Sequence, residues 1–366
     1  MKFPDAMTTP PVPASPEKSR IPVMFSATGS WGLPLGVAIH TLCLHASSGR
    51  FYDIHIVHDG MDARIIQELN QVAAPFPQVS LSFLQLPEEF RLLFQNGNKD
   101  RYSPLAYARL MAGSLFPQYG RIVYLDADVL LAGDVAELYF SDLRGASVAA
   151  AGDGLALWSI EKGTMHPHLE YMGNYLSSPL SYCNSGVLVL DLDQMRRRNL
   201  EHRLLQQLRN RPEPFPYPDQ DILNIALHGD MTTLPPEWNF QFLSWTWDEE
   251  KTRLLRGTEF ENVPSISCGR SWKLLHMVGP EKPWRLPDAP RNHGTVPLDP
   301  VLLFLVAGSK EASRVPGGTG CDFPGAGPAP PAPYPRPAME TVLLPRPYFP
   351  ETPGQNQVAE KIAVHS

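Results

Sequence analysis

The sequence lacks the features that mark several large classes of protein. The apolar run VLLFLVA at 301–307 is far shorter than the roughly 20 residues of a membrane-spanning helix. The first 18 residues contain no apolar core of a secretory signal. The formal net charge is −7, whereas nucleic-acid binders are typically basic. We therefore expect a cytoplasmic protein with no transmembrane segment and no nucleic-acid partner, and peripheral contact with the inner face of a membrane stays open.

Cysteine is scarce, and the number and spacing of the cysteines argue against a zinc site and against a disulfide framework. The four cysteines are Cys43, Cys183, Cys268 and Cys321, and none belongs to a C-x-x-C pair or to a Cys/His spacing typical of zinc. A disulfide framework is a feature of small secreted chains, and this chain has 366 residues. We expect reduced thiols, as in the cytosol.

Proline is in clear excess, and its distribution divides the chain. There are 39 prolines, about twice the usual share. Residues 1–20 contain 5 and residues 286–366 contain 16, whereas residues 21–285 contain only 18. We expect a disordered tail over 1–20, a Pro-rich and largely disordered tail over 286–366, and a folded domain over 21–285.

Strand patterns and helix patterns alternate through the first half of this domain. The expected strands are 21–28, 52–58, 79–86, 121–125, 147–151, 186–192 and 274–278. The expected helices are 35–45, 62–72, 105–115, 193–209 and 221–227. This alternation predicts an α/β fold with a mainly parallel central sheet.

Two carboxylates follow the apolar strand at 121–125. Asp126 and Asp128 are spaced i, i+2, which places both side chains on the same side of an extended backbone. Open α/β sheets bind ligands at the carboxyl ends of their strands, where such a pair can hold a divalent cation. The chain has two further D-x-D patterns, at 191–193 and 219–221, and turns or helix caps explain most patterns of this kind. Only Asp126 and Asp128 lie between two apolar runs, which favours a metal site there.

The segment HMVGPEKPW at 276–284 follows the last expected strand. Its imidazole, at His276, suits Mn²⁺ better than Mg²⁺, and Lys282 offers a positive charge to a phosphate. The alternative interpretation is a hydrogen-bonded core histidine and a solvated lysine. Polar residues also stand beside core elements at 184–186 (NSG) and 217–221 (YPDQD), where Asp219 could simply cap the next helix.

In this order, the motifs resemble glycosyltransferase family 8, the retaining group that includes bacterial lipopolysaccharide galactosyl- and glucosyltransferases and glycogenin. The resemblance covers about 21–285. Its stretches are IPVMFSAT and LPLGVAIHTL within 21–42, FYDIHIVHDG at 51–60, YARL at 107–110, RIVYLDADVLLAGDVAELY at 121–139, NSGVLVLDL at 184–192, YPDQDILN at 217–224, LPPEWNFQ at 234–241 and HMVGPEKPW at 276–284. It implies a GT-A fold, in which a Rossmann-like sheet flanked by helices binds a UDP-sugar and Mn²⁺, with Mg²⁺ as the alternative ion.

The resemblance also implies a role for individual residues. Asp126, Asp128 and His276 match the metal ligands. Lys282 matches a lysine that contacts the diphosphate, and Gly279 a glycine that lets the backbone approach it. The remaining positions of the donor site are Ser26 and Thr28 at the uracil and ribose, Ala127 between the two aspartates, Arg109, which reaches the donor sugar, and Asp153, Asn184, Asp219 and Gln220, which line it.

One loop departs from the family pattern. The family commonly has an acidic residue and an asparagine after the first strand, where this chain reads SATGSW at 26–31. Thr28 can hydrogen-bond a uracil edge, but it cannot act as a carboxylate acceptor for the N3–H group. The adjacent Trp31 would either stack at this place or fill the core.

The implied reaction transfers galactose or glucose from the UDP-sugar to an acceptor hydroxyl with retention of the anomeric configuration. The acceptor would be a saccharide or glycolipid, such as lipopolysaccharide or another surface glycan. An amide is a poor nucleophile, so Gln220 favours front-side attack, in which the leaving phosphate takes the acceptor proton. Asp219, Asp153 and Arg109 complete the catalytic group, and 91–102 is a candidate lid.

Two other functions fit parts of the sequence. A nucleotide-sugar-binding module without turnover would explain the altered loop at 26–31. A sugar nucleotidyltransferase would also use acidic metal ligands on a Rossmann-like sheet. It should, however, carry a Gly-rich basic loop after the first strand, and the segment ATGSWGLP contains neither lysine nor arginine.

Overall fold

The computed structural model describes the chain in several stretches. These are residues 19–93, 103–209, 216–241, 253, 256, 272–279, 282 and 284. All of them belong to one unit of the chain, Met1–Thr319. Nearly all of both expected tails, Cys268, Cys321 and most of the candidate lid lie outside the described residues. Cys43 and Cys183 are buried.

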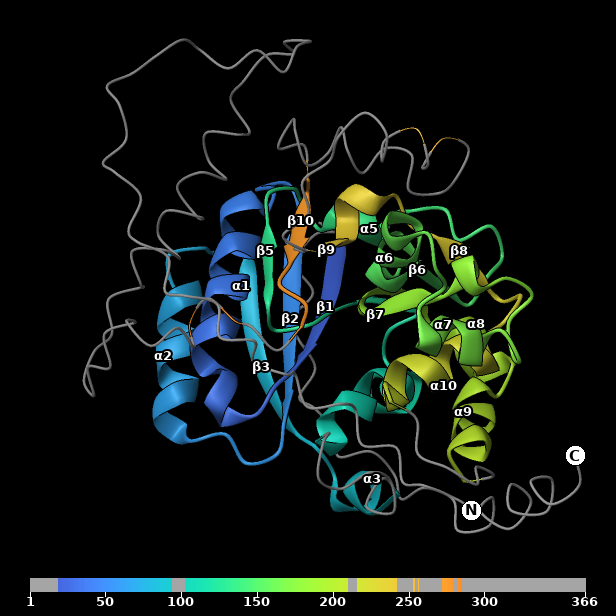
Figure 1. Cartoon of the computed structure of the whole chain (residues 1–366). Helices are drawn as coiled ribbons and strands as arrows, with labels where there is room; N and C mark the ends of the chain where they lie inside the picture. Colours follow the sequence, from blue (N-terminus) through green and yellow to red (C-terminus); the bar gives the residue numbers. More distant parts are fainter. Residues whose placement is uncertain are drawn as a thin grey trace, which may run out of the picture. The chain divides into compact units, whose positions relative to one another are not determined.

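The N-terminal half of the central sheet is parallel, as predicted (Figure 1). Its strands are β1 (Arg20–Ser26), β2 (Phe51–His58), β3 (Val79–Gln85) and β4 (Arg121–Leu125). Strand β1 pairs with β2 and β4, and β2 pairs with β3. Val23, Met24 and Phe25 are fully buried, because a central strand of this kind is covered on both faces.

The other half of the sheet contains one reversed strand. Strand β7 (Cys183–Asp191) runs antiparallel to β4 and to β6 (Val148–Gly152), and β8 (Met231–Thr233) pairs in parallel with β6. The strand order is β3-β2-β1-β4-β7-β6-β8. Four of the six neighbouring pairs are parallel, so the predicted mainly parallel α/β sheet is confirmed.

Helices cover both faces of this sheet. Helices α1 (Gly32–His45) and α2 (Ala63–Ala73) share one core with β1 and β2. Helices α8 (Leu192–Arg197), α9 (Leu200–Arg209) and α10 (Pro218–Ala226) share the other core with β4 and β7. The shorter elements are α3 (Glu88–Leu93), α4 (Ala112–Leu115), α5 (Ala136–Tyr139), α6 (Gly154–Lys162), α7 (Pro167–Met172) and the 3₁₀ helices η1 (Gly29–Trp31), η2 (Pro104–Met111), η3 (Pro179–Ser181) and η4 (Pro236–Asn239).

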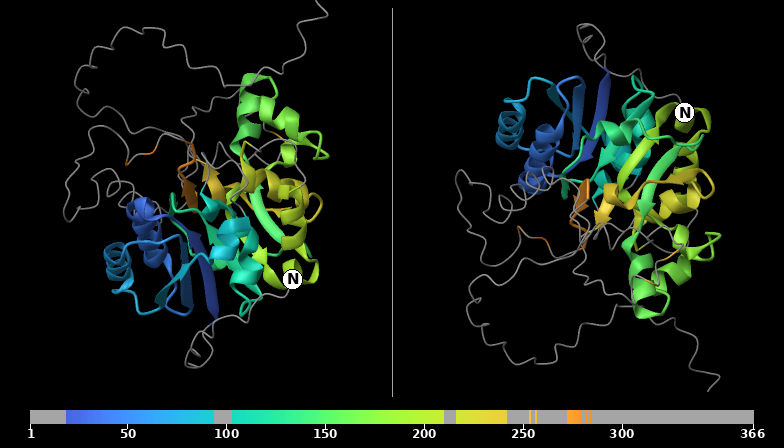
Figure 2. Two further views of the ribbon diagram at one scale, coloured as in Figure 1. Left: turned by 90° about the horizontal axis from the view of Figure 1, so that it is seen from below. Right: turned by 90° about the horizontal axis from the view of Figure 1, so that it is seen from above.

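A second, three-stranded sheet joins distant parts of the chain. Strand β10 (Leu274–His276) pairs antiparallel with β5 (Val129–Leu131) and in parallel with β9 (Phe240–Gln241). Figure 2 shows β10 in orange between the blue N-terminal elements and the green and yellow elements that follow residue 150. This small sheet is what brings the end of β10 to the end of β4.

Several expected helices differ from the observed ones. The helix expected at 105–115 is mainly 3₁₀ (η2), and α4 forms only its last turn. The helix expected at 193–209 is two helices, because Asn199 has a φ of 51° between them. Asp191, rather than Asp193, caps α8 by accepting a hydrogen bond from Gln194 N, so a cap explains that D-x-D pattern.

The proposed cap at Asp219 is wrong. Helix α10 begins at Pro218, and its N-cap residue is Tyr217, whose backbone N–H donates to Asp221 Oδ2 at 3.0 Å. The side chain of Asp219 instead accepts a hydrogen bond from Ser185 Oγ at 3.0 Å, inside the molecule. The proline in its first turn is typical of a helix start, since its fixed φ and missing N–H suit that position.

Helices α6 and α7 were not predicted. Among the described helices, none has the length and apolarity needed to cross a membrane.

His55 on β2 gives the fold an expected pH dependence. Burial, partly offset by Asp53, lowers the pKa of His55 to about 4. The unfolded chain takes up this proton near pH 6.5, so the unfolded state binds more protons than the folded state in this range. We expect the free energy of unfolding to fall by on the order of 2 kcal/mol between about pH 7 and pH 4 through this group. Urea unfolding at both pH values, compared with His55→Gln, measures it. An unchanged pH dependence in the variant would contradict the assignment.

Candidate metal and donor site

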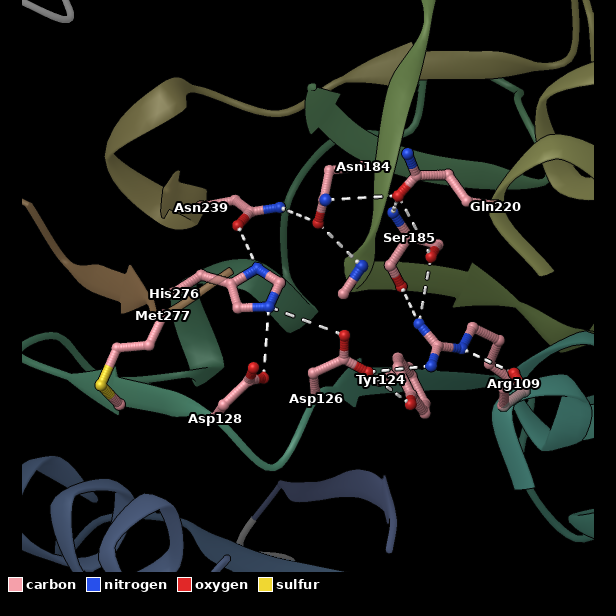
Figure 3. A network of polar contacts seen from close by, with 12 residues as sticks. Arg109, Tyr124, Asp126, Asp128, Asn184, Ser185, Gln220, Asn239, His276 and Met277 are labelled. Carbon is pink, nitrogen blue, oxygen red and sulfur yellow. Dashed lines mark hydrogen bonds and ion pairs between the residues drawn. The ribbon is translucent and has the colours of Figure 1, made fainter. Parts of the chain in front are cut away.

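Two carboxylates and one imidazole converge beside the end of β4. One ligand atom from each of Asp126, Asp128 and His276 lies within 4.8 Å of the others. His276 Nε2 is 3.6 Å from Asp126 Oδ2 and 3.3 Å from Asp128 Oδ1 (Figure 3). Asp126 follows β4, Asp128 precedes β5, and His276 ends β10, so both sheets contribute. Two carboxylates and one imidazole are a donor set that suits Mn²⁺, and the three residues predicted as metal ligands are brought together.

Lys282 lies against one of these carboxylates. Its Nζ donates to Asp128 Oδ2 at 2.6 Å and also contacts the carbonyl oxygen of Met277. The residue is only 8% exposed, so the alternative of a solvated surface lysine is wrong. The Lys282 ammonium also makes cation–π contacts with Trp31 and Trp284, whose ring centroids lie 5.7 and 5.9 Å from Nζ.

The charge of Asp128 is set by these neighbours. Burial opposes ionisation and would raise its pKa, but His276 and Lys282 outweigh burial and hold the pKa below its usual range. Asp128 is therefore ionised at neutral pH, the state in which a carboxylate binds a cation.

Arg109 bridges the metal ligands to the predicted sugar-lining residues. Its guanidinium lies 2.9 Å from Asp126 Oδ1 and 3.3 Å from Asp219 Oδ2, and it donates to the carbonyl oxygen of Ser185 at 2.8 Å. Burial would lower the pKa of Arg109, but Asp126, Tyr124 and Asp219 raise it, so the cation persists. Burial raises the pKa of Asp219, and Arg109 opposes that shift. Arg109 thus holds two buried carboxylates in place.

Side-chain amides form a network next to Arg109. Asp153 Oδ2 accepts hydrogen bonds from Asn184 Nδ2 and Gln220 Nε2, each at 3.0 Å. Gln220 Oε1 accepts from Ser185 N at 3.0 Å. Asp153 also caps α6 through Leu155 N, so it has a structural role besides any role toward a sugar. The structure therefore places Asp153, Asn184 and Gln220 together, although they come from different elements.

The first loop reaches the same site through a tyrosine that sequence reasoning missed. Tyr124 O–H donates to Asp126 Oδ1 at 2.7 Å and lies 2.9 Å from Ser26 Oγ. Thr28 Oγ1 contacts Ser30 Oγ at 2.8 Å instead. Trp31 packs against the core and meets Trp284 edge to face, with centroids 5.8 Å apart. Trp31 is thus partly buried, and its stacking at the donor nucleotide stays a prediction.

Three further residues of the site were not predicted. Asn239 Oδ1 lies 3.0 Å from His276 Nδ1, and Ser185 Oγ donates to Asp219. Gly186 lies so close to the ligands that a side chain there would collide with His276 and Asp126. Ser185 and Gly186 belong to the polar segment 184–186 noted in the sequence, and Asn239 belongs to the stretch LPPEWNFQ that carries the family resemblance, but no role was assigned to any of the three. Gly279 has a φ of +86°, a conformation that favours glycine.

Comparison with known proteins places the chain in a family. The model of the family "Glycosyl transferase family 8" matches residues 22–286. The lipopolysaccharide 1,2-glucosyltransferase of Escherichia coli K12 is 32% identical over 187 residues, which are 50% of this chain and 50% of the relative. General stress protein A of Bacillus subtilis is 21% identical over 267 residues, covering 72% of this chain and 86% of that protein. The match to the E. coli protein thus spans only half the length of that relative.

Solved structures share the fold at low sequence identity. The bifunctional glycosyltransferase WbbM superposes with a TM-score of 0.63 at 22% identity, over 82% of this chain and 52% of that one. The galactosyltransferase LgtC, in complex with donor and acceptor sugar analogs, gives a TM-score of 0.55 at 18% identity, over 81% of this chain and 98% of that one. These likenesses identify the GT-A fold that the sequence predicted. Because the family model spans most of the described domain and the predicted motifs meet at one site, the chain belongs to glycosyl transferase family 8.

Proposed function

We propose that this protein is a retaining glycosyltransferase that transfers a hexose, galactose or glucose, from a UDP-sugar to an acceptor hydroxyl and depends on Mn²⁺. The observation that carries the proposal is the convergence of Asp126, Asp128 and His276, with Lys282 beside them. This set of ligands with a neighbouring ammonium group suits a metal diphosphate. The names of the E. coli relative and of LgtC support a saccharide or glycolipid acceptor, such as lipopolysaccharide. We place the reaction in the cytoplasm, where contact with the inner membrane face would bring a glycolipid within reach.

The chain's own residues would bind the donor and neutralise charge. Asp126, Asp128 and His276 would hold the ion, which when bound supplies Lewis-acid stabilisation of the departing diphosphate. Lys282 would add a second positive group at the diphosphate. The positions assigned to the nucleotide are Ser26, Thr28, Ala127 and Gly279.

The bond changes proposed here involve no covalent enzyme intermediate. The bond between the anomeric carbon and the phosphate oxygen breaks, the bond to the acceptor oxygen forms on the same face, and the leaving phosphate takes the acceptor proton. Gln220 supports this route because its carbonyl oxygen accepts from Ser185 N and its N–H₂ group donates to Asp153. An amide engaged in this way orients a sugar rather than attacking it. Asp153, Asn184, Asp219 and Arg109 would orient the sugar hydroxyls.

UDP release tests the proposal. Purified protein is incubated with UDP-glucose or UDP-galactose, with and without Mn²⁺, and released UDP and transferred product are measured by coupled assay and mass spectrometry. We expect Mn²⁺-dependent release with one of the two donors, and Mg²⁺ to support a lower rate. UDP binding without turnover of any nucleotide sugar would instead identify the binding module, the alternative that the altered loop at 26–31 favours.

A further inference from the structure

Asn239 lies next to the Nδ1 atom of the His276 imidazole, whereas the Nε2 atom faces the two aspartates (Figure 3). It ends η4 just before β9, and β9 pairs with β10, the strand that carries His276. Asn239 is 3% exposed and has two polar contacts of 3.0 Å: its Oδ1 meets His276 Nδ1, and its Nδ2 donates to Asn184 Oδ1. A buried side chain with both ends engaged has one allowed orientation.

The neighbouring hydrogen bonds decide which end of the Asn239 amide faces the histidine. Asn184 Nδ2 donates to Asp153 Oδ2, and Asn184 Oδ1 accepts from Gly186 N, so Oδ1 can only accept. Asn239 must therefore present its N–H₂ group to Asn184 and its carbonyl oxygen to His276. An amide oxygen cannot donate, so His276 carries a proton on Nδ1, and in the neutral ring Nε2 is left with its lone pair.

The ring nitrogen that Asn239 does not contact faces the two aspartates. Nε2 is the atom that lies 3.3 Å from Asp128 Oδ1 and 3.6 Å from Asp126 Oδ2. Histidines that bind metals are generally oriented by an acceptor on their other ring nitrogen, and loss of that acceptor typically costs metal affinity. Asn239 stands where such an acceptor is needed, and its other end reaches Asn184, which contacts Gln220.

We propose that Asn239 is a positioning residue for this site. It holds His276 in the Nδ1–H tautomer, with Nε2 free to bind the ion, and it connects the metal ligand to the Asn184 and Gln220 amides. The inference rests on the proposed function for the ion and the donor sugar, but its statement about the tautomer does not.

The tautomer is tested without metal or nucleotide. Nitrogen NMR of metal-free protein labelled at histidine, recorded at increasing alkaline pH until the ring is neutral, reports which ring nitrogen carries the proton. The signal of His276 is assigned by its loss in His276→Gln. We expect the Nδ1–H form in the wild type and a shift toward the Nε2–H form in Asn239→Leu. An Nε2–H form in the wild type, or no change in Asn239→Leu, overturns the inference whatever the enzymatic activity.

Metal affinity and donor kinetics test the second part. Mn²⁺ titrations followed by electron paramagnetic resonance should show a loss of about 10- to 100-fold in Asn239→Leu. Asn239→Asp keeps an acceptor for His276 Nδ1 but has no N–H for Asn184, so it should recover most of the Mn²⁺ affinity while UDP release stays impaired. Asn224→Leu is the control for the loss of a buried amide, because Asn224 is fully buried and bonds to the backbone of Cys183 and Gln220.

The outcomes separate the inference from the proposed function. Wild-type Mn²⁺ affinity in Asn239→Leu, or Asn239→Asp as weak as Asn239→Leu, overturns the inference while leaving UDP release in the wild type intact. An equal loss of affinity in Asn224→Leu overturns it as well, since general loosening would then explain the effect. A wild-type protein that neither binds Mn²⁺ nor releases UDP overturns the proposed function and, with it, the metal part of the inference.

Discussion

Replacing Asp128 with alanine is expected to abolish Mn²⁺ binding and to lower UDP release about a thousandfold or more, the loss typical when the main electrostatic stabilisation is removed. Asp128 is the buried carboxylate that faces both His276 Nε2, at 3.3 Å, and Lys282 Nζ, at 2.6 Å. Its loss removes one ligand and, among the described residues, leaves the Lys282 ammonium with the Met277 carbonyl oxygen and the rings of Trp31 and Trp284. Mn²⁺ titration and UDP release measure the two effects separately.

Two further variants make this prediction specific. Asp128→Asn keeps the size of the side chain and should lose Mn²⁺ affinity in the same direction, because an amide oxygen is a weaker ligand than a carboxylate. Asp193→Ala removes an aspartate from another D-x-D pattern; this one lies on the surface of α8 and pairs with Arg196 at 2.7 Å. It should bind Mn²⁺ and release UDP like the wild type. Near wild-type turnover in Asp128→Ala would refute the metal assignment.

Gly186→Ala is expected to disrupt the site with a single methyl group. A Cβ at this position would lie 2.6 Å from Asp126 Oδ2 and closer still to the His276 ring. Because Asp126 and His276 are held by Arg109 and by Asn239, neither can move away without breaking a buried contact. We expect a drop in UDP release of at least about 100-fold and a loss of about 1–3 kcal/mol in the free energy of unfolding, the usual cost of overpacking.

The matched control for this substitution is Gly36→Ala in α1. A Cβ on Gly36 would meet Leu69 Cδ2 at 3.5 Å, an ordinary van der Waals contact. Alanine is favoured over glycine in a helix, so this variant should gain roughly 0.5–1 kcal/mol in stability and keep its turnover. UDP release and urea unfolding of both variants give the comparison. A Gly186→Ala variant with unchanged Mn²⁺ affinity would show that the ligands tolerate displacement.

The sequence predicted the parallel strands well because their signal is local. The strands expected at 21–28, 52–58 and 121–125 are apolar or alternating runs, and burial on a sheet requires such runs. The short strands β5 and β9 gave no such signal, because three or two residues carry no period. The 3₁₀ helix at 104–111 also escaped prediction, since its apolar spacing resembles that of an α-helix.

The sequence by itself determined the residue types of the site: the carboxylate pair, the histidine with its lysine, and the polar segments at 184–186 and 217–221. Tertiary structure decided how these residues act together. His276 is 148 positions from Asp128, and only the pairing of β10 with β5 brings them within 3.3 Å. The same pairing brings Lys282 against Asp128, and the pairing of β10 with β9 brings Asn239 to the Nδ1 atom of His276. Hydrogen bonds and charge pairs between distant segments leave no periodic trace in the chain, so Tyr124 and Asn239 became visible as site residues only in the folded molecule, as did the individual contacts of Ser185 and Gly186.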